Sequence, residues 1–144
     1  MKKLVFGATI GAALLGISGQ VAAACPGTPL SASALSTLLQ GNTVCSGSAP
    51  NWTWQEQHRG SAPGPSPLWD YKRGPTDAVD PSEQVGTWNI TSSRTGASTV
   101  THTYGGSPFT YTVSPNGGNS FSFCPAGAGT QVEATVKNGQ SSCP

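Results

Sequence analysis

Apolar and polar residues alternate along most of the chain after residue 50. In seven successive segments, every second position is mainly aromatic or aliphatic, and the positions between are mainly threonine, serine or charged. An antiparallel sheet with one buried face has this period of two, and threonine suits the exposed face. The pattern predicts a shared buried face made of Trp52/Trp54, Trp69/Tyr71, Trp88/Ile90, Val100/Tyr104, Phe109/Tyr111/Val113, Phe121/Phe123 and Val132/Ala134/Val136.

Turn-forming residues divide these alternating segments into short strands. Gly-Gly, Asn-Gly-Gly and Gly-Ala-Gly sequences separate the later segments and suit tight connections. With one short segment before them, strands are expected at 42–46, 52–58, 68–72, 85–91, 99–104, 109–114, 120–124 and 131–137.

A single helix is expected at Ser31–Gln40, where leucines follow one another at helical spacing. Ser31 can cap its N-terminus, and Gly41 follows its C-terminus. A helix of this length is not stable alone in water, so its apolar face must pack on the sheet. The fold class is therefore mainly β: an antiparallel β-meander or small barrel of about seven to eight strands, with one short N-terminal helix covering an open end or face.

The first 24 residues have the three-part pattern of a secretory signal peptide. Lys2 and Lys3 precede the apolar run Leu4–Ile17, and small residues end the segment at Val21–Ala24. The apolar run is shorter than the ~20 residues that a membrane-spanning helix needs. We expect a signal peptide at 1–24 and a single exported domain at 25–144, periplasmic or extracellular, without a transmembrane segment.

All four cysteines (Cys25, Cys45, Cys124 and Cys143) lie in the expected mature domain. An even number in an exported chain predicts two disulfides, and four cysteines allow three pairings. The favoured pairing is Cys25–Cys45 with Cys124–Cys143, since each pair is the nearest in sequence. Two alternatives to disulfides are less favoured. Acylation of Cys25 would leave three cysteines, which cannot all pair, and the chain has no Cys-x-x-Cys spacing typical of a zinc site.

The low charge of the chain excludes several classes of protein. Charged residues make up 9% of the sequence, and residues 25–144 hold five basic and six acidic side chains. A coiled coil would need far more charge, and so few basic residues cannot form a stripe that follows nucleic-acid phosphates. We expect no nucleic-acid partner.

Four aromatic residues are the candidate ligand-binding residues: Trp52, Trp54, Trp69 and Tyr71. They fall on one predicted face within about twenty residues, next to irregular loops. Tryptophans at the mouth of a groove could stack on a sugar or another flat ligand, although a small domain with few aliphatic residues could also use them as core. The neighbouring Asp70, Lys72 and Arg73 are expected to face solvent.

The two histidines offer the alternative chemistry. His102 lies in the apolar register and is expected to point inward, where a histidine most often bonds a tyrosine or a carbonyl. If His58 lay near it, the pair with Glu56 could bind a metal or act in a small hydrolase. Asp77, Asp80 and Glu83 do not have the number of oxygen ligands or the glycine-bearing turn of a calcium-binding loop, so we expect this segment to be a solvated turn. We therefore assign no catalytic residue, no metal and no cofactor.

Short motifs give the chain a resemblance to known proteins. A leucine-bearing helix runs into Gly41-Asn42-Thr43-Val44, and Gly86-Thr87-Trp88 and a strand that ends in cysteine follow. This arrangement resembles small exported bacterial domains of unassigned function. The Gly-x-Trp element is also similar to the first strand of calycins such as lipocalins and avidin-like proteins, although here it lies in the middle of the chain.

The sequence favours an exported, non-catalytic binding or interaction module. Its partner would be a small molecule, a glycan or an envelope protein, bound by an aromatic face. Two alternatives remain: a structural component of the cell envelope or of a secreted assembly, and a small hydrolase or metal-binding protein that uses His58 and His102.

Overall fold

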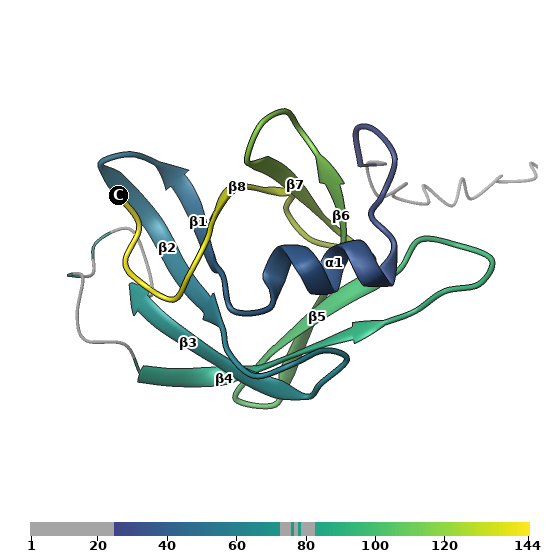
Figure 1. Cartoon of the computed structure of the whole chain (residues 1–144), viewed down its shortest axis with the longest axis horizontal. Helices are drawn as coiled ribbons and strands as arrows, with labels where there is room; N and C mark the ends of the chain where they lie inside the picture. The colour runs from purple at the N-terminus through teal and green to yellow at the C-terminus, as the bar shows by residue number, and fades with distance from the viewer. Residues whose placement is uncertain (1–24, 73–75, 77, 79–82) are drawn as a thin grey trace, which may run out of the picture.

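Eight antiparallel strands form a closed barrel in which each strand pairs with the next along the chain. The structure is a computed structural model that describes residues 25–72, 76, 78 and 83–144 (Figure 1). The last strand pairs with the first and closes the barrel. The strands are β1 (Thr43–Ser48), β2 (Asn51–His58), β3 (Ser66–Lys72), β4 (Glu83–Thr91), β5 (Thr99–Tyr104), β6 (Ser107–Pro115), β7 (Ser120–Pro125) and β8 (Val132–Lys137).

This architecture confirms the predicted fold class, a mainly β domain with one short helix and two disulfides. Each observed strand overlaps a predicted one, and the differences in their ends are a few residues. The expected signal peptide, residues 1–24, lies outside the described residues, as do Asp77 and Asp80 of the acidic loop. Among the described helices, none has the length and apolar character to cross a bilayer.

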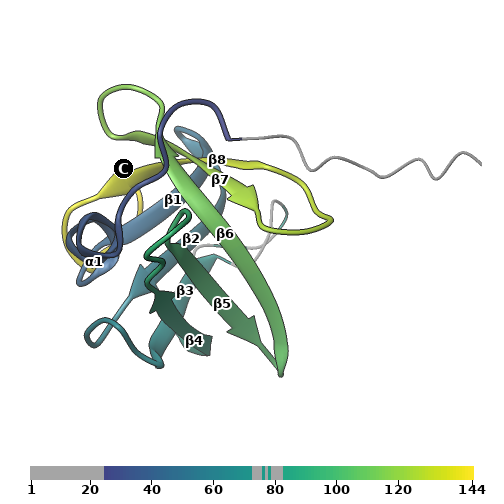
Figure 2. The same ribbon diagram turned by 90° about the vertical axis from the view of Figure 1, so that its right-hand side faces the viewer.

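Helix α1 (Ala32–Leu39) covers one end of the barrel. The Ser31 hydroxyl accepts a hydrogen bond from the backbone N–H of Ala34, as expected of an N-cap. Leu35 and Leu39 are fully buried and belong to the barrel core. Figure 1 shows the helix lying across the ring of strands, and Figure 2 shows it nearly end-on at one side of the molecule. The helix therefore closes one opening of the barrel.

The barrel core lies below this helix and consists of the inward residues that the alternation predicts. Trp88 is fully buried, and its indole N–H donates to the backbone carbonyl of Arg59. Further core residues come from β4 to β8, namely Ile90, Val100, Val113, Phe123, Ala134 and Val136. The period-two pattern thus predicted the inner face of these strands correctly.

The inner face of β2 and β3 differs from the prediction. In β2, Thr53 is an extra residue between two paired positions: Ser46 pairs with Trp54, and Gly47 pairs with Trp52. Such a bulge changes the phase of the alternation, so Trp52 and Trp54 do not share a face. In β3 the buried residues are Leu68 and Asp70, and the half-buried Trp69 lies on the other face. The expectation that Asp70 faces solvent was therefore wrong.

The disulfides join Cys25 to Cys124 and Cys45 to Cys143, so the predicted pairing was wrong. The prediction paired cysteines that are neighbours in sequence, whereas in the closed barrel the N-terminal segment lies against β7 and the C-terminal segment lies against β1. The segment before α1 runs beside β6, where the N–H of Leu30 donates to the carbonyl of Val113. The segment after β8 runs along β1 and β2 (Figure 1), and each terminal segment is tied to a barrel strand.

Candidate functional site

The end of the barrel opposite α1 contains a cavity of about 590 Å³. Its walls are mainly apolar and aromatic, and the side chains that form them come from strands all round the barrel. The apolar lining residues are Val44, Val85, Val132, Phe109 and Phe123, and the remaining aromatic ones are Trp54, Tyr104 and Tyr111. The alternation that builds the core below thus also builds the wall of the cavity above.

Burial increases along the strands from the cavity mouth toward the helix. In β6, Phe109 is 48% exposed, Tyr111 is half-buried and Val113 is fully buried. In β2, Trp54 is 40% exposed and His58 is fully buried. Trp54 and Phe109 therefore lie at the mouth, and deeper residues define the base.

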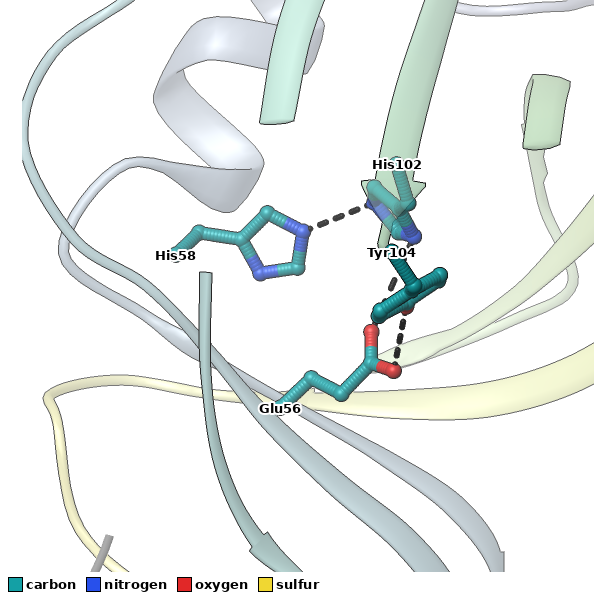
Figure 3. Close-up of polar contacts among 4 residues, drawn as sticks. All are labelled: Glu56, His58, His102 and Tyr104. Carbon is teal, nitrogen blue, oxygen red and sulfur yellow. Dashed lines mark hydrogen bonds and ion pairs between the residues drawn. The ribbon is translucent and has the colours of Figure 1, made fainter. Parts of the chain in front are cut away.

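Polar side chains gather at the base of this cavity. Glu56 of β2 and His102 and Tyr104 of β5 line it, and the buried His58 lies against His102 (Figure 3). The Tyr104 hydroxyl donates a hydrogen bond of 2.5 Å to Oε1 of Glu56. The Nδ1 atom of His102 is 3.7 Å from Oε2 of Glu56, and its Nε2 is 3.0 Å from Nε2 of His58. The four side chains form a polar chain across the barrel, because β2 and β5 face each other.

Burial sets the protonation of this cluster. Desolvation raises the pKa of Glu56 to about 7, and the hydrogen bond from Tyr104 opposes part of that rise. Desolvation lowers the pKa of His102 to about 4. The pKa of His58 is also lowered, by desolvation and then by the nearby His102. Both imidazoles are therefore neutral at pH 7, and Glu56 loses its proton near that pH.

The two histidines form a hydrogen-bonded pair. Because each neutral imidazole carries one N–H, one Nε2 donates and the other accepts. In this 3.0 Å hydrogen bond the donating Nε2 carries the proton and the lone pair of the accepting Nε2 is occupied, so neither Nε2 offers a lone pair to a metal ion. Among the described residues, no group of three or more His, Cys, Asp or Glu side chains is arranged to hold a metal ion.

A second carboxyl group lies beside Glu56 at the base. Asp70 lines the cavity and is 6% exposed, and it is the cross-strand partner of Glu56 in the pairing of β2 with β3. The negative charges of Glu56 and Asp70 contribute, after desolvation, to the raised pKa of Tyr104. The two carboxyl groups therefore act on the same small region of the cavity.

The four aromatic candidates are distributed over different surfaces. Trp54 lines the cavity at its mouth. Trp52 is buried, and its indole N–H donates to the carbonyl of the C-terminal Pro144. Trp69 is covered by the guanidinium of Arg59, 4.0 Å from its ring centroid. Tyr71 is the extra residue of a bulge in β3. The structure thus brings only Trp54 of the four to the cavity.

Glu56, His58 and His102 form one possible group on the sequence alone, but the distance between the two histidines is a property of the fold. Asp70, Tyr104 and Tyr111 line the cavity without having been predicted as site residues. The alternation in β5 and β6 predicts both tyrosines on the inner face. In β3, Leu68 and Asp70 are two positions apart and share the inner face, so an inward Leu68 would have indicated an inward Asp70. The prediction instead took Trp69 and Tyr71 as the inward pair, because both are aromatic.

No protein-family model matches this chain, no curated protein is significantly similar to it, and no solved structure matches it. What the site can bind or do therefore follows from the cavity and the groups that line it.

Proposed function

We propose that this protein is an exported, non-catalytic binding module that holds one small amphiphilic molecule inside its barrel. The observation that carries the proposal is the cavity of about 590 Å³, with apolar walls and a polar base. Ligand pockets for small molecules span about 300–1,000 Å³ and combine apolar walls with a few placed polar groups. The cavity matches this description in size and in lining.

The rest of the fold supports a rigid container. Helix α1 closes the opposite end, and the disulfides fix both terminal segments to the barrel wall. An eight-stranded barrel of this kind has an interior wide enough for one small ligand. The same architecture supports the proposed relationship to calycins, and the two disulfides support export.

Strand-edge assembly, the basis of the structural alternative, receives less support. Every strand from β1 to β8 pairs on both sides, including β1 with β8. Closure of a sheet into a barrel removes the edges through which chains could pair.

A fluorescent probe of apolar cavities tests the proposal. The neutral probe N-phenyl-1-naphthylamine should bind the mature, disulfide-bonded protein saturably, at one site per chain. Val132→Trp, which places an indole in the cavity wall, should weaken binding by about tenfold or more, since filling the pocket removes the ligand's apolar contacts. Thr91→Trp adds the same indole at an exposed position and should bind the probe as the wild type does.

The outcome distinguishes an internal site from a surface one. Equal probe affinity in Val132→Trp and Thr91→Trp, with both variants folded by circular dichroism, would mean that the probe binds outside the barrel. Absence of saturable binding to the wild type would refute the proposal directly.

A further inference from the structure

Two polar atoms at the base of the cavity lie at a distance too long for a direct hydrogen bond. Nδ1 of His102 and Oε2 of Glu56 are 3.7 Å apart (Figure 3). An N–H···O hydrogen bond spans about 2.7–3.2 Å. The remaining exposure of the two side chains, 7% for His102 and 15% for Glu56, is toward the cavity that both line. A hydroxyl oxygen can bridge two such atoms, as an ordered water does.

The other polar atoms of these two side chains are already hydrogen-bonded. Oε1 of Glu56 accepts from the Tyr104 hydroxyl at 2.5 Å, and Nε2 of His102 is 3.0 Å from Nε2 of His58. These bonds orient both side chains and leave Oε2 and Nδ1 for a bound molecule. A ligand that excludes water from the base must supply partners for these two atoms, since a buried polar group without a partner is unfavourable.

The hydrogen-bonding role of each of the two atoms changes with protonation. Oε2 accepts when Glu56 is ionised and can donate when it is protonated, and with a pKa of about 7 both forms are populated near neutral pH. Nδ1 of the neutral His102 is a donor or an acceptor, according to which histidine donates in the bond between the Nε2 atoms. A hydroxyl both donates and accepts, whereas an ammonium only donates and a carboxylate only accepts. A hydroxyl can therefore bond this pair in every state, and it bridges both atoms when one donates and the other accepts.

Aromatic rings surround the polar pair and continue toward the mouth. The ring centroid of His102 is 5.9 Å from that of Tyr111 and 6.5 Å from that of Phe123. The ring centroid of Tyr104 is 5.8 Å from that of Phe109, which lies at the mouth. A polar pair at the base with aromatic rings above it suits a molecule that has one polar end and an apolar body.

We propose that the ligand of this cavity is an uncharged amphiphile with a terminal hydroxyl group, which bridges Oε2 of Glu56 and Nδ1 of His102 while the apolar body extends past Tyr111 toward Phe109 at the mouth. This inference rests on the proposed ligand-binding function and specifies its ligand class. Selectivity follows from the two polar atoms, because an analogue without the hydroxyl would leave both of them unpaired.

Three ligands with one common ring system test the role of the hydroxyl. The polar group of 2-(1-naphthyl)ethanol donates and accepts, that of 1-(2-methoxyethyl)naphthalene only accepts, and 1-propylnaphthalene carries a methyl group in its place. Their affinities for the mature, disulfide-bonded protein are measured at about pH 7 by displacement of N-phenyl-1-naphthylamine. We expect the alcohol to bind about tenfold or more tightly than 1-propylnaphthalene, although the hydrocarbon is more apolar, and the ether to bind more weakly than the alcohol.

A pair of matched variants locates the preference. Glu56→Leu removes the Oε2 atom from the base and keeps an apolar side chain of similar size there. The preference for the alcohol over 1-propylnaphthalene should fall by about tenfold, while the affinity for 1-propylnaphthalene falls by less than about twofold. Glu133→Leu removes an exposed carboxyl of β8 and is the matched control, so it should keep the wild-type preference. Retained binding of 1-propylnaphthalene shows that a variant is folded.

The ligand series on the wild type separates the two proposals. If 1-propylnaphthalene binds as tightly as the alcohol or more tightly, the hydroxyl assignment is overturned and the binding function stands. Tighter binding of the cationic analogue 2-(1-naphthyl)ethylamine than of the alcohol would overturn the assignment to an uncharged ligand. Failure of all these ligands and of the probe to bind would instead overturn the binding function. An alcohol preference that persists in Glu56→Leu would overturn the assignment of the hydroxyl to Glu56.

Discussion

The buried carboxyl of Glu56 should make the protein less stable at alkaline pH, and Glu56→Gln should remove this effect. Desolvation raises its pKa from 4.5 to about 7 in the folded protein. The carboxyl therefore stabilises the fold fully below about pH 4.5, and this contribution is lost as pH rises through about 7. A glutamine has nearly the same shape, can still accept the Tyr104 hydrogen bond, and does not titrate.

The size of the effect follows from the two pKa values. Each tenfold difference in proton affinity between the folded and unfolded protein corresponds to about 1.4 kcal/mol. The rise from 4.5 to about 7 thus amounts to about 3 kcal/mol in the free energy of unfolding. We expect Glu56→Gln to exceed the wild type in stability by about that amount at pH 8 and to match it near pH 4.5.

Urea unfolding from pH 4.5 to 8, followed by tryptophan fluorescence, measures this difference. His58 and His102, whose pKa values are lowered, destabilise both proteins as pH falls, so their contribution cancels in the difference. Glu133→Gln, at an exposed carboxyl, should change stability by less than about 1 kcal/mol. A difference between Glu56→Gln and the wild type that stays constant from pH 4.5 to 8 would refute the assignment of a raised pKa to Glu56.

Two further predictions concern the scaffold. Cys45→Ser removes a disulfide between residues 98 positions apart and should lower the free energy of unfolding by about 4–5 kcal/mol. Cys143→Ser should lower it by the same amount, and the double variant should lose no more than either single variant. If denaturant titrations instead show that the two losses add, the two cysteines are not paired with each other. Trp88→Ala should lower the free energy of unfolding by about 3–5 kcal/mol and leave little folded protein, because Trp88 is fully buried. Trp69→Ala, at a half-buried position, should lower it by less than about 1.5 kcal/mol. Equal losses of stability in parallel thermal melts would mean that Trp69 also belongs to the core.

The sequence determined the elements of this fold because their signals are local. A residue's neighbours two positions away indicate which side of a strand it occupies, which is how the inward positions of Trp88, His102 and Val113 were predicted. The same holds for α1, whose cap and leucine spacing lie within ten residues. Local patterns also placed Tyr104 and Tyr111 on the inner face, where they line the cavity.

Only the tertiary structure decided which of these positions meet. The bulge at Thr53 arises from the pairing of β2 with β1, and it separates Trp52 from Trp54. Barrel closure pairs cysteines almost a hundred residues apart, and it places His58 of β2 against His102 of β5. These contacts depend on strand register and on which strands face each other across the interior. Neither property is encoded in the period of one strand, because register is a relation between strands and closure is a relation among all eight.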